Sequence, residues 1–268
     1  MKRPATGATR RSIGRWLAWG AAALSLLVGI APARANTPPF QPGEELLFRA
    51  SYLNFDAGKI TVQVERDRSD GRAVWPIDVH AKTQGLAWLM YRIRQHFVSE
   101  FEPRHDRSIG TLLESRVGKE NRVERVRYQG AKALVQETKD GRTVESAHPM
   151  LPGAQDLLAA FFELRGRPLA VGSRFSVPVW CGRKSWRLTG TVVGRQQLKT
   201  QAGTFQTKVV RLRTHFGGKF DAHRDLTLWI SDDDRRLPVQ IAADFFVGTM
   251  KLDLVSYRPG GLTAEQER

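Results

Sequence analysis

Residues 45–65 read ELLFRASYLNFDAGKITVQVE, and this stretch decides the fold. Apolar side chains recur at every second position from Leu46 to Tyr52, and they do so again from Ile60 to Val64. Alternation with a period of two is typical of strands that bury one face. The turn-forming residues 54–58 separate the two runs, so the sequence predicts a β-hairpin.

The same alternation continues through most of the chain. It predicts further strands at residues 74–83, 96–102, 111–117, 121–128, 133–138, 142–147, 174–180, 185–193, 204–213, 225–230, 237–245 and 249–257. Short strands with close turn signals are typical of an antiparallel meander. So many strands do not fit one flat sheet. We therefore expect a mainly β fold, in which a strongly curved antiparallel sheet forms an open or spiral β-barrel around one short helix.

One segment has the pattern of that helix. Asp156 can cap its start, Leu157–Arg165 carries apolar residues around most of a helical circumference, and Gly166 with Pro168 supplies the stop. A helix that is apolar on most sides is expected to be buried on more than one side. A second short apolar stretch, residues 86–91, predicts a helical turn that links two strands.

The first 35 residues are typical of an export signal. Basic residues precede an apolar run from Leu17 to Ile30, and Ala33-Arg34-Ala35 matches a small-x-small cleavage site. The run is shorter than the roughly 20 residues of a membrane-spanning helix, which favours a cleaved signal over an anchor. We expect cleavage after Ala35 and a soluble protein in the periplasm. The pair Arg10-Arg11 leaves open whether export follows the general secretory or the twin-arginine route.

After that signal we expect one β-barrel-like domain over residues 36–258 and a disordered tail over 259–268. The signal holds six basic and no acidic residues, so the rest of the chain has 36 Lys and Arg against 27 Asp and Glu. These charges form no long basic run, which argues against a nucleic-acid arm. A basic surface that faces anionic envelope lipid explains them better, and peripheral membrane contact is one expected use.

The sequence shows no catalytic or cofactor motif. There is no nucleophile elbow, phosphate-binding loop or dinucleotide fingerprint. Cys181 stands without a partner cysteine or a patterned base, so we expect a buried, inert thiol. The sequence therefore predicts no enzyme, no catalytic residue and no cofactor, although carboxylates far apart in sequence could still converge.

Metal-ligand patterns are weak. Asp232, Asp233 and Asp234 could bind Ca²⁺ through carboxylate oxygens, but their position between two strands and beside two arginines favours a polar connecting loop. The six histidines lack the helical spacing of zinc hydrolases. His80 and His96 lie on neighbouring strands and could face each other, but two histidines without a third ligand do not establish a site. We therefore expect no metal.

Four stretches resemble the bacterial family called domain of unknown function 3108. They are Gly43-Glu44-x-Leu46, Asp56-Ala57-Gly58, Asp156-Leu157-Leu158-Ala159 with Phe161-Phe162-x-Leu164-Arg165, and Trp229-Ile230-Ser231-Asp232-Asp233 with Arg236-Leu237-Pro238-Val239. The resemblance covers nearly all of residues 40–257 and implies a secreted envelope protein with no established activity. At the level of fold, the chain is also similar to periplasmic lipoprotein carriers with unclosed β-barrels and to β-spiral envelope-integrity proteins.

The leading hypothesis is a non-enzymatic periplasmic protein that binds a hydrophobic or lipid-like envelope component on the apolar concave side of its sheet. The candidate lining residues are Leu157, Phe161 and Phe162 on the helix, with Trp88, Leu89 and Met90 at the rim. Residue by residue, ordinary core packing is the simpler interpretation of each of them. Two alternatives stay open. One is a scaffold that recruits an envelope protein partner, and the other is an envelope polymer hydrolase that uses Glu100, Glu102 or Asp225.

Overall fold

The computed structural model describes residues 38–69, 71–85, 88, 92–214, 224–244 and 248–261. The chain divides into two compact units, residues 1–35 and 36–268, and every described residue belongs to the second. The expected signal, most of the expected tail, and Leu89 and Met90 lie outside the described residues. No helix among the described residues has both the length and the apolar character to cross a membrane.

The predicted opening hairpin is confirmed. Strand β1 (Glu45–Tyr52) pairs with β2 (Phe55–Val64) in antiparallel register. The turn is tighter than the sequence indicates, because only Leu53 and Asn54 lie outside the strands and both have positive φ angles of 50° and 67°. Such two-residue turns match the right-handed twist of the strands they join. A register shift between Ala50 and Ser51 accommodates the tight turn.

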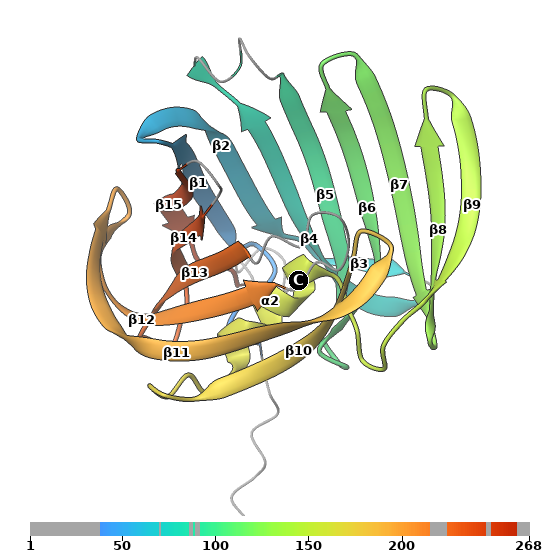
Figure 1. Cartoon of the computed structure of the whole chain (residues 1–268). Helices are drawn as coiled ribbons and strands as arrows, with labels where there is room; N and C mark the ends of the chain where they lie inside the picture. The colour runs from blue at the N-terminus through green and yellow to red at the C-terminus, as the bar shows by residue number, and fades with distance from the viewer. Residues whose placement is uncertain are drawn as a thin grey trace, which may run out of the picture. The chain divides into compact units, whose positions relative to one another are not determined.

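The remaining strands follow the chain around a curved sheet (Figure 1). Their bounds are β3 (Asp67–Ser69), β4 (Arg72–Thr83), β5 (Ile93–Glu102), β6 (Arg107–Val117), β7 (Glu120–Gln129), β8 (Lys132–Lys139), β9 (Arg142–Pro149), β10 (Arg174–Cys181), β11 (Lys184–Thr200), β12 (Gly203–Thr214), β13 (Arg224–Ser231), β14 (Pro238–Asp244) and β15 (Thr249–Arg258). The spatial order is β10-β11-β12-β13-β14-β15-β1-β2-β4-β5-β6-β7-β8-β9, with β3 paired to β4.

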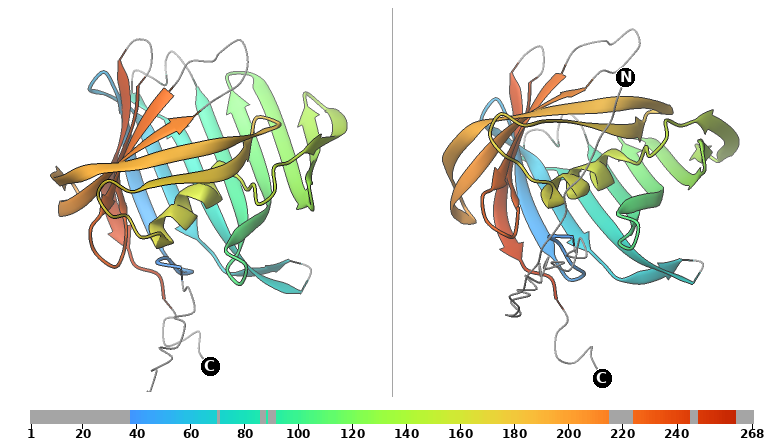
Figure 2. Two further views of the ribbon diagram at one scale, coloured as in Figure 1. Left: turned by 60° about the horizontal axis from the view of Figure 1, so that its bottom comes forward. Right: turned by 90° about the horizontal axis from the view of Figure 1, so that it is seen from below.

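The strand order shows where the curved sheet is open. The last strand, β15, pairs with the first, β1, so the two ends of the sheet in space are β9 and β10, which are neighbours in sequence. The segment between β9 and β10 contains helix α2 (Leu157–Gly166), which lies between the two halves of the sheet (Figure 2). The expected strongly curved antiparallel sheet around one short helix is confirmed.

Several contacts cross the break between β9 and β10. Gln155, just before the helix, forms an isolated parallel bridge with Val179 of β10. Arg183, in the turn between β10 and β11, forms an ion pair with Glu137 of β8. Within the described residues no ladder joins β9 to β10, so side-chain and loop contacts hold the two edges together.

Helix α2 is buried on two sides, as its apolar pattern predicts. The Asp156 side chain accepts a hydrogen bond of 2.9 Å from the backbone N–H of Ala159, which is the expected N-cap. Ala159 and Phe162 pack into one apolar cluster with β1, β2, β4 and β5. Ala160 and Leu164 pack into a second cluster with β10 to β13. The helix thus joins the two halves of the sheet through a shared core.

The largest error in the predicted strand boundaries concerns β11. The sequence suggests that Gly194 ends a strand, but β11 continues to Thr200. The register with β12 shifts between Val192 and Gly194, which marks a bulge. A glycine in a strand can accommodate a bulge as well as end the strand, and periodicity alone does not distinguish the two.

Candidate functional site

The described members of the predicted ligand-lining set lie in different parts of the fold. Phe162 is only 4% exposed and packs edge-on against Phe40, with ring centroids 4.7 Å apart. Leu157 and Phe161 are half-buried against the second cluster. Trp88 is 40% exposed in the connection between β4 and β5. The positions of Leu89 and Met90 lie outside the described residues, so the predicted set remains untested as a whole.

A buried ion pair lies where three of the family-like stretches converge. The guanidinium of Arg165, at the end of α2, donates to both carboxylate oxygens of Glu44, over 2.6 and 3.1 Å, and each side chain is 2% exposed. Arg165 also donates to the backbone carbonyls of Arg235 and Arg236, over 3.0 and 3.1 Å. The guanidinium lies 5.4 Å from the Phe40 ring centroid. This cluster has its charge fully paired, which indicates a structural role.

A second buried polar group surrounds the N-cap of the helix. The Ser99 hydroxyl donates to Asp156 over 2.8 Å, and Gln155 accepts a bond of 3.1 Å from the backbone N–H of Ser108. Burial raises the pKa of Asp156 despite these hydrogen bonds. Every contact in this group stays within the protein, so it positions the helix and presents no group to solvent.

The opposite face of the sheet carries a large hollow. We call the face that contacts α2 the inner face and the other the outer face. The hollow lies over β2, β4, β5, β6 and β7 and has a volume of about 830 Å³. Its polar lining includes Lys59, Thr61, His80, Lys82, Arg94, His96, Glu114 and Arg116. A charged, solvent-open hollow of this kind suits a polar ligand better than an acyl chain.

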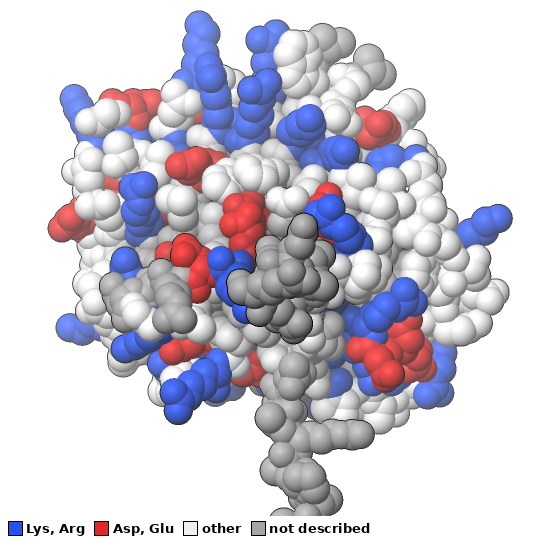
Figure 3. Space-filling model, turned by 180° about the vertical axis from the view of Figure 1, so that it is seen from behind, with Lys and Arg blue, Asp and Glu red and all other residues white. Residues whose placement is uncertain are grey.

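Strand register places five cations in one line across the outer face. The paired positions are Arg49 with Lys59, Lys59 with Lys82, Lys82 with Arg94, and Arg94 with Arg116. We call these five residues the basic row. No described carboxylate forms an ion pair with any of them. Figure 3 shows this outer face, with Lys and Arg side chains gathered along its upper edge.

Like charges at directly opposed positions destabilise a sheet. The basic row contains four such oppositions in succession and no acid between them. Lys59 is half-buried, and the other four side chains are exposed. The fold gains nothing from this arrangement by itself, whereas a bound anion would neutralise it.

A second hollow of about 660 Å³ borders the same row. Lys82, Arg94 and Arg116 line it together with Trp88 and Arg92. The Arg92 guanidinium lies 4.3 Å from the Trp88 ring centroid, which is a cation–π contact. An exposed tryptophan among cations is typical of surfaces that contact lipid headgroups.

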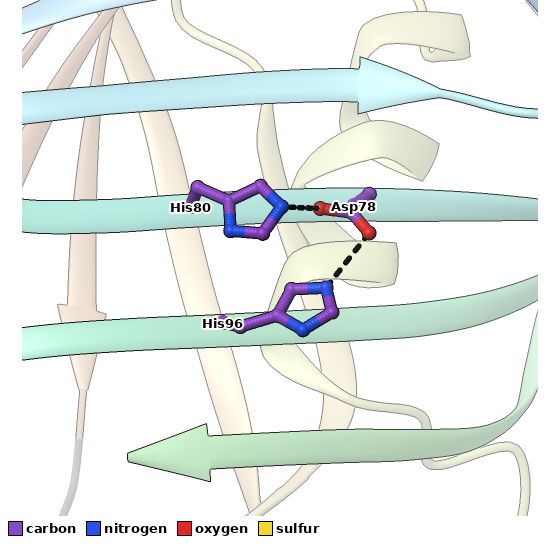
Figure 4. Close-up of side chains that lie close together, drawn as sticks. All are labelled: Asp78, His80 and His96. Carbon is purple, nitrogen blue, oxygen red and sulfur yellow. Dashed lines mark hydrogen bonds and ion pairs between the residues drawn. The ribbon is translucent and has the colours of Figure 1, made fainter. Parts of the chain in front are cut away.

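Next to the basic row lies a cluster of two histidines and two carboxylates, of which Figure 4 shows His80, His96 and Asp78. His80 and His96 occupy directly paired positions on β4 and β5, and their rings stack with centroids 4.3 Å apart at 9°. Nε2 of His80 lies 3.1 Å from Oδ1 of Asp78, and Nε2 of His96 lies 2.8 Å from Oδ2. On the other side, Nδ1 of His96 lies 3.4 Å from Oε2 of Glu114.

The two carboxylates affect the protonation of His96. Burial lowers its pKa, but hydrogen bonds and charge attraction from Asp78 and Glu114 together raise the pKa above its ordinary value. The imidazolium of His96 is therefore favoured in the folded protein, where both ring nitrogens can donate to a carboxylate.

The three carboxylates considered for a hydrolase site either make other contacts or have a side chain outside the described residues. Glu102 is 4% exposed and forms ion pairs with His105 and Arg107, over 2.8 and 3.5 Å. Burial raises its pKa, but these partners, with Arg72, hold it below the usual range, which disfavours a general acid at neutral pH. Glu100 lies on β5 with its carboxylate against Gly110. The side chain of Asp225 is outside the described residues.

Other predicted features are placed as follows. Asp232 pairs with Lys208 and Arg195, over 2.9 and 3.0 Å, and Asp233 pairs with Arg235 over 2.5 Å. The polar-loop interpretation of residues 232–234 therefore fits better than a calcium site.

Cys181 is half-buried, and burial raises the pKa of its thiol, which agrees with an unreactive residue.

Comparison with known proteins gives a family and a fold. The profile of the family described as "Protein of unknown function (DUF3108)" matches residues 47–255. The chain belongs to this family. No curated protein matches the chain.

Among solved structures, the chain is similar to a β-barrel-like protein of domain of unknown function DUF1849 from Brucella abortus. The TM-score is 0.58 at 10% identity, over 83% of this chain and 99% of that one. Weaker likenesses are a predicted lipoprotein of Parabacteroides distasonis (TM-score 0.36, 9% identity, 83% and 99% covered) and a hypothetical protein of Chlamydia trachomatis (TM-score 0.37, 10% identity, 85% and 93% covered). The Brucella likeness shows a shared β-barrel-like fold.

Proposed function

We propose that this protein is a non-enzymatic component of the bacterial cell envelope, exported to the periplasm, which binds an anionic lipid surface through its basic row. The observation that carries the proposal is the line of five cations from Arg49 to Arg116, which have no described ion-pair partner. The proposal keeps the lipid-like ligand expected from the sequence. It moves the contact from the inner face to the outer face.

The arrangement fits a membrane surface better than a small soluble anion. The five cations extend across five adjacent strands, from β1 to β6, and strands lie about 4.8 Å apart. One phosphate group cannot reach them all, but an array of lipid headgroups can. Each Lys or Arg near an anionic leaflet contributes about 1 kcal/mol. Trp88, which lines the adjoining hollow, would lie at the level of the headgroups.

Vesicle flotation tests this function. The purified protein is mixed with vesicles of phosphatidylcholine that contain either 30% or no phosphatidylglycerol. We expect binding only to the anionic vesicles, and we expect it to weaken as salt is raised. The triple variant Lys82→Gln, Arg94→Gln, Arg116→Gln should bind roughly 100-fold more weakly, at about 1 kcal/mol for each lost charge.

A matched variant separates the row from net charge. This control removes an equal number of positive charges, three, from exposed positions outside the row; it is the triple variant Lys132→Gln, Lys199→Gln, Arg211→Gln. This variant should keep most of the binding. Equal losses in the two triple variants would show that only net charge matters, and absence of binding by the unaltered protein would refute the proposal.

A second candidate rests on the half-buried apolar pair on α2. Leu157 and Phe161 lie four residues apart, on the same face of the helix, and both keep some exposed surface. They could contact the chain of a hydrophobic ligand, as the sequence predicts. Native mass spectrometry of protein purified from the periplasm would then show a co-purifying lipid, which a Phe161→Asn variant would lack. Protein without any lipid would refute this candidate.

A further inference from the structure

We propose that Asp78, His80 and His96 bind a divalent transition-metal ion of the zinc class on the outer face of the sheet, with Glu114 orienting one of the ligands. The candidate ligand atoms are one carboxylate oxygen of Asp78 and one ring nitrogen of each histidine, and these atoms all lie within 4.8 Å of one another. This inference is separate from the proposed membrane contact and rests on different residues.

The geometry matches the size of such an ion. Zinc bonds to imidazole nitrogen and carboxylate oxygen are about 2.0–2.2 Å long, so neighbouring ligand atoms in a tetrahedral site lie roughly 3.3 Å apart. The nitrogen–oxygen separations at Asp78 are 3.1 Å from His80 to Oδ1 and 2.8 Å from His96 to Oδ2. The two rings are stacked, with their planes 9° apart, so at least one imidazole must rotate about its side-chain bonds before both nitrogens can bind the same ion. Figure 4 shows both Nε2 atoms turned toward the same carboxylate.

The sheet fixes these positions before any ion arrives. His80 and His96 are direct cross-strand partners, and Asp78 precedes His80 by two residues, so it shares the same face. Because all three residues lie within regular strands, their backbones cannot move apart independently. A site on rigid strands loses little conformational entropy when it binds an ion.

Glu114 supplies the second layer that histidine ligands commonly have. Its carboxylate lies on the Nδ1 side of His96, at 3.4 Å, from the paired position on β6. A carboxylate that accepts the Nδ1–H proton leaves the lone pair on Nε2, which is the atom that faces Asp78. The opposite ring nitrogen is therefore set up for a metal, and the role of Glu114 is positioning.

The charge around the cluster is balanced enough to admit a cation. Asp78 and Glu114 face the histidines with two negative charges, while Lys82 and Arg94 lie two residues further along the same strands. Those two cations oppose a metal, so affinity should rise with moderate salt, which screens them. The side-chain exposures of 59% for His80, 26% for His96 and 15% for Asp78 leave one side open to water. Three protein ligands and a water molecule complete four-fold coordination.

Metal titration tests the site. The protein, purified without a histidine tag and stripped with chelator, is titrated with Co²⁺ followed by absorption and with Zn²⁺ followed by calorimetry. We expect one ion per chain, with cobalt bands of four-fold coordination.

Variants decide which residues are ligands. His80→Ala, His96→Ala and Asp78→Asn should each abolish the single site, and Glu114→Gln should weaken it about tenfold. His105→Ala is the control, because it removes an exposed histidine that also pairs with a carboxylate, in the turn between β5 and β6. Circular dichroism and urea unfolding establish that each variant is folded. Absence of metal binding by the unaltered protein, or unchanged binding by folded His80→Ala and His96→Ala, would overturn the proposal.

Discussion

The charged residues on the inner and outer faces of the sheet differ in whether they have ion-pair partners. On the inner side, Arg165 and Glu44 are fully buried, and the Arg165 guanidinium donates to both Glu44 oxygens and to backbone carbonyls. On the outer side, the basic row from Arg49 to Arg116 opposes like charges and has no described ion-pair partner. A buried charge must be paired for the protein to fold. An exposed charge may stay unpaired, and it then remains available to bind a ligand.

The difference separates stability from binding. Removing an inner charge should unfold the protein or weaken it severely, with no direct effect on ligands. Removing outer charges should leave the fold intact, or improve it, while binding is lost. The following variants test each part of this contrast, beginning with the largest effect.

Arg165→Ala should cause the greatest loss of stability. It leaves the Glu44 carboxylate buried without a partner, which costs about 3–5 kcal/mol. Urea unfolding measures the change. The double variant Glu44→Gln, Arg165→Met should cost less than the single one, because no unpaired charge remains. If Arg165→Ala lowers the free energy of unfolding by less than about 1 kcal/mol, the Glu44–Arg165 pair does not have the structural role inferred from its burial.

Asp156→Ala should have an intermediate effect. It removes the helix N-cap and the acceptor of the Ser99 hydroxyl together, and a lost cap costs about 0.5–2 kcal/mol. Asp156→Asn is the informative control, because an asparagine oxygen can still cap the helix. It should retain most of the stability in urea unfolding. An equal loss in both variants would assign the effect to the negative charge and not to the cap.

Neutralising part of the basic row should change stability in the opposite direction. Lys82→Gln with Arg94→Gln removes an opposed pair of like charges, which should stabilise the protein by about 0.2–1 kcal/mol. The urea midpoint should therefore rise, and the gain should shrink at high salt. A fall in the midpoint would mean that the two side chains contribute to the fold through their packing.

The smallest expected effect is a pH dependence that comes from His96. Its pKa in the folded protein is raised by Asp78 and Glu114, although burial opposes this. The resulting stabilisation is fully present below the unfolded pKa of about 6.5 and is lost as pH rises through the higher folded pKa. The stability difference between the unaltered protein and His96→Gln, measured with chelator present, should thus be larger at pH 6 than at pH 8.5. The reverse order would contradict the raised pKa.

Local patterns predicted the fold well because each strand carries its own signal. The alternation of Leu46 to Val64 fixes the hairpin, and Asp156 with Gly166 brackets the helix. The tally of strands also implies curvature. The bulge at Gly194 could not be predicted, because it depends on how β11 aligns with β12. The short strand β3 has too few residues to produce a pattern.

The candidate sites were harder to predict because they depend on register across strands. The sequence suggests that His80 and His96 could face each other, and they do. Asp78 and Glu114 complete the cluster only because β4, β5 and β6 align as they do. The basic row has the same origin, since its residues are scattered from position 49 to position 116. The sequence offers one signal for the basic row, which is the number of outward-facing charges on each predicted strand.

The pairing of β1 with β15 has a consequence for biogenesis. The first strand gains its second neighbour only when residues 249–258 have been made, about 200 positions later. Until then, one edge of β1 remains open and the Arg235 and Arg236 carbonyls that hold Arg165 are also missing. Long-range strand pairing of this kind is slow, and unpaired strand edges that are prone to aggregation stay exposed until it is complete. While only the first half of the chain has been synthesised, the sheet is therefore unfinished and one edge of β1 has no strand beside it.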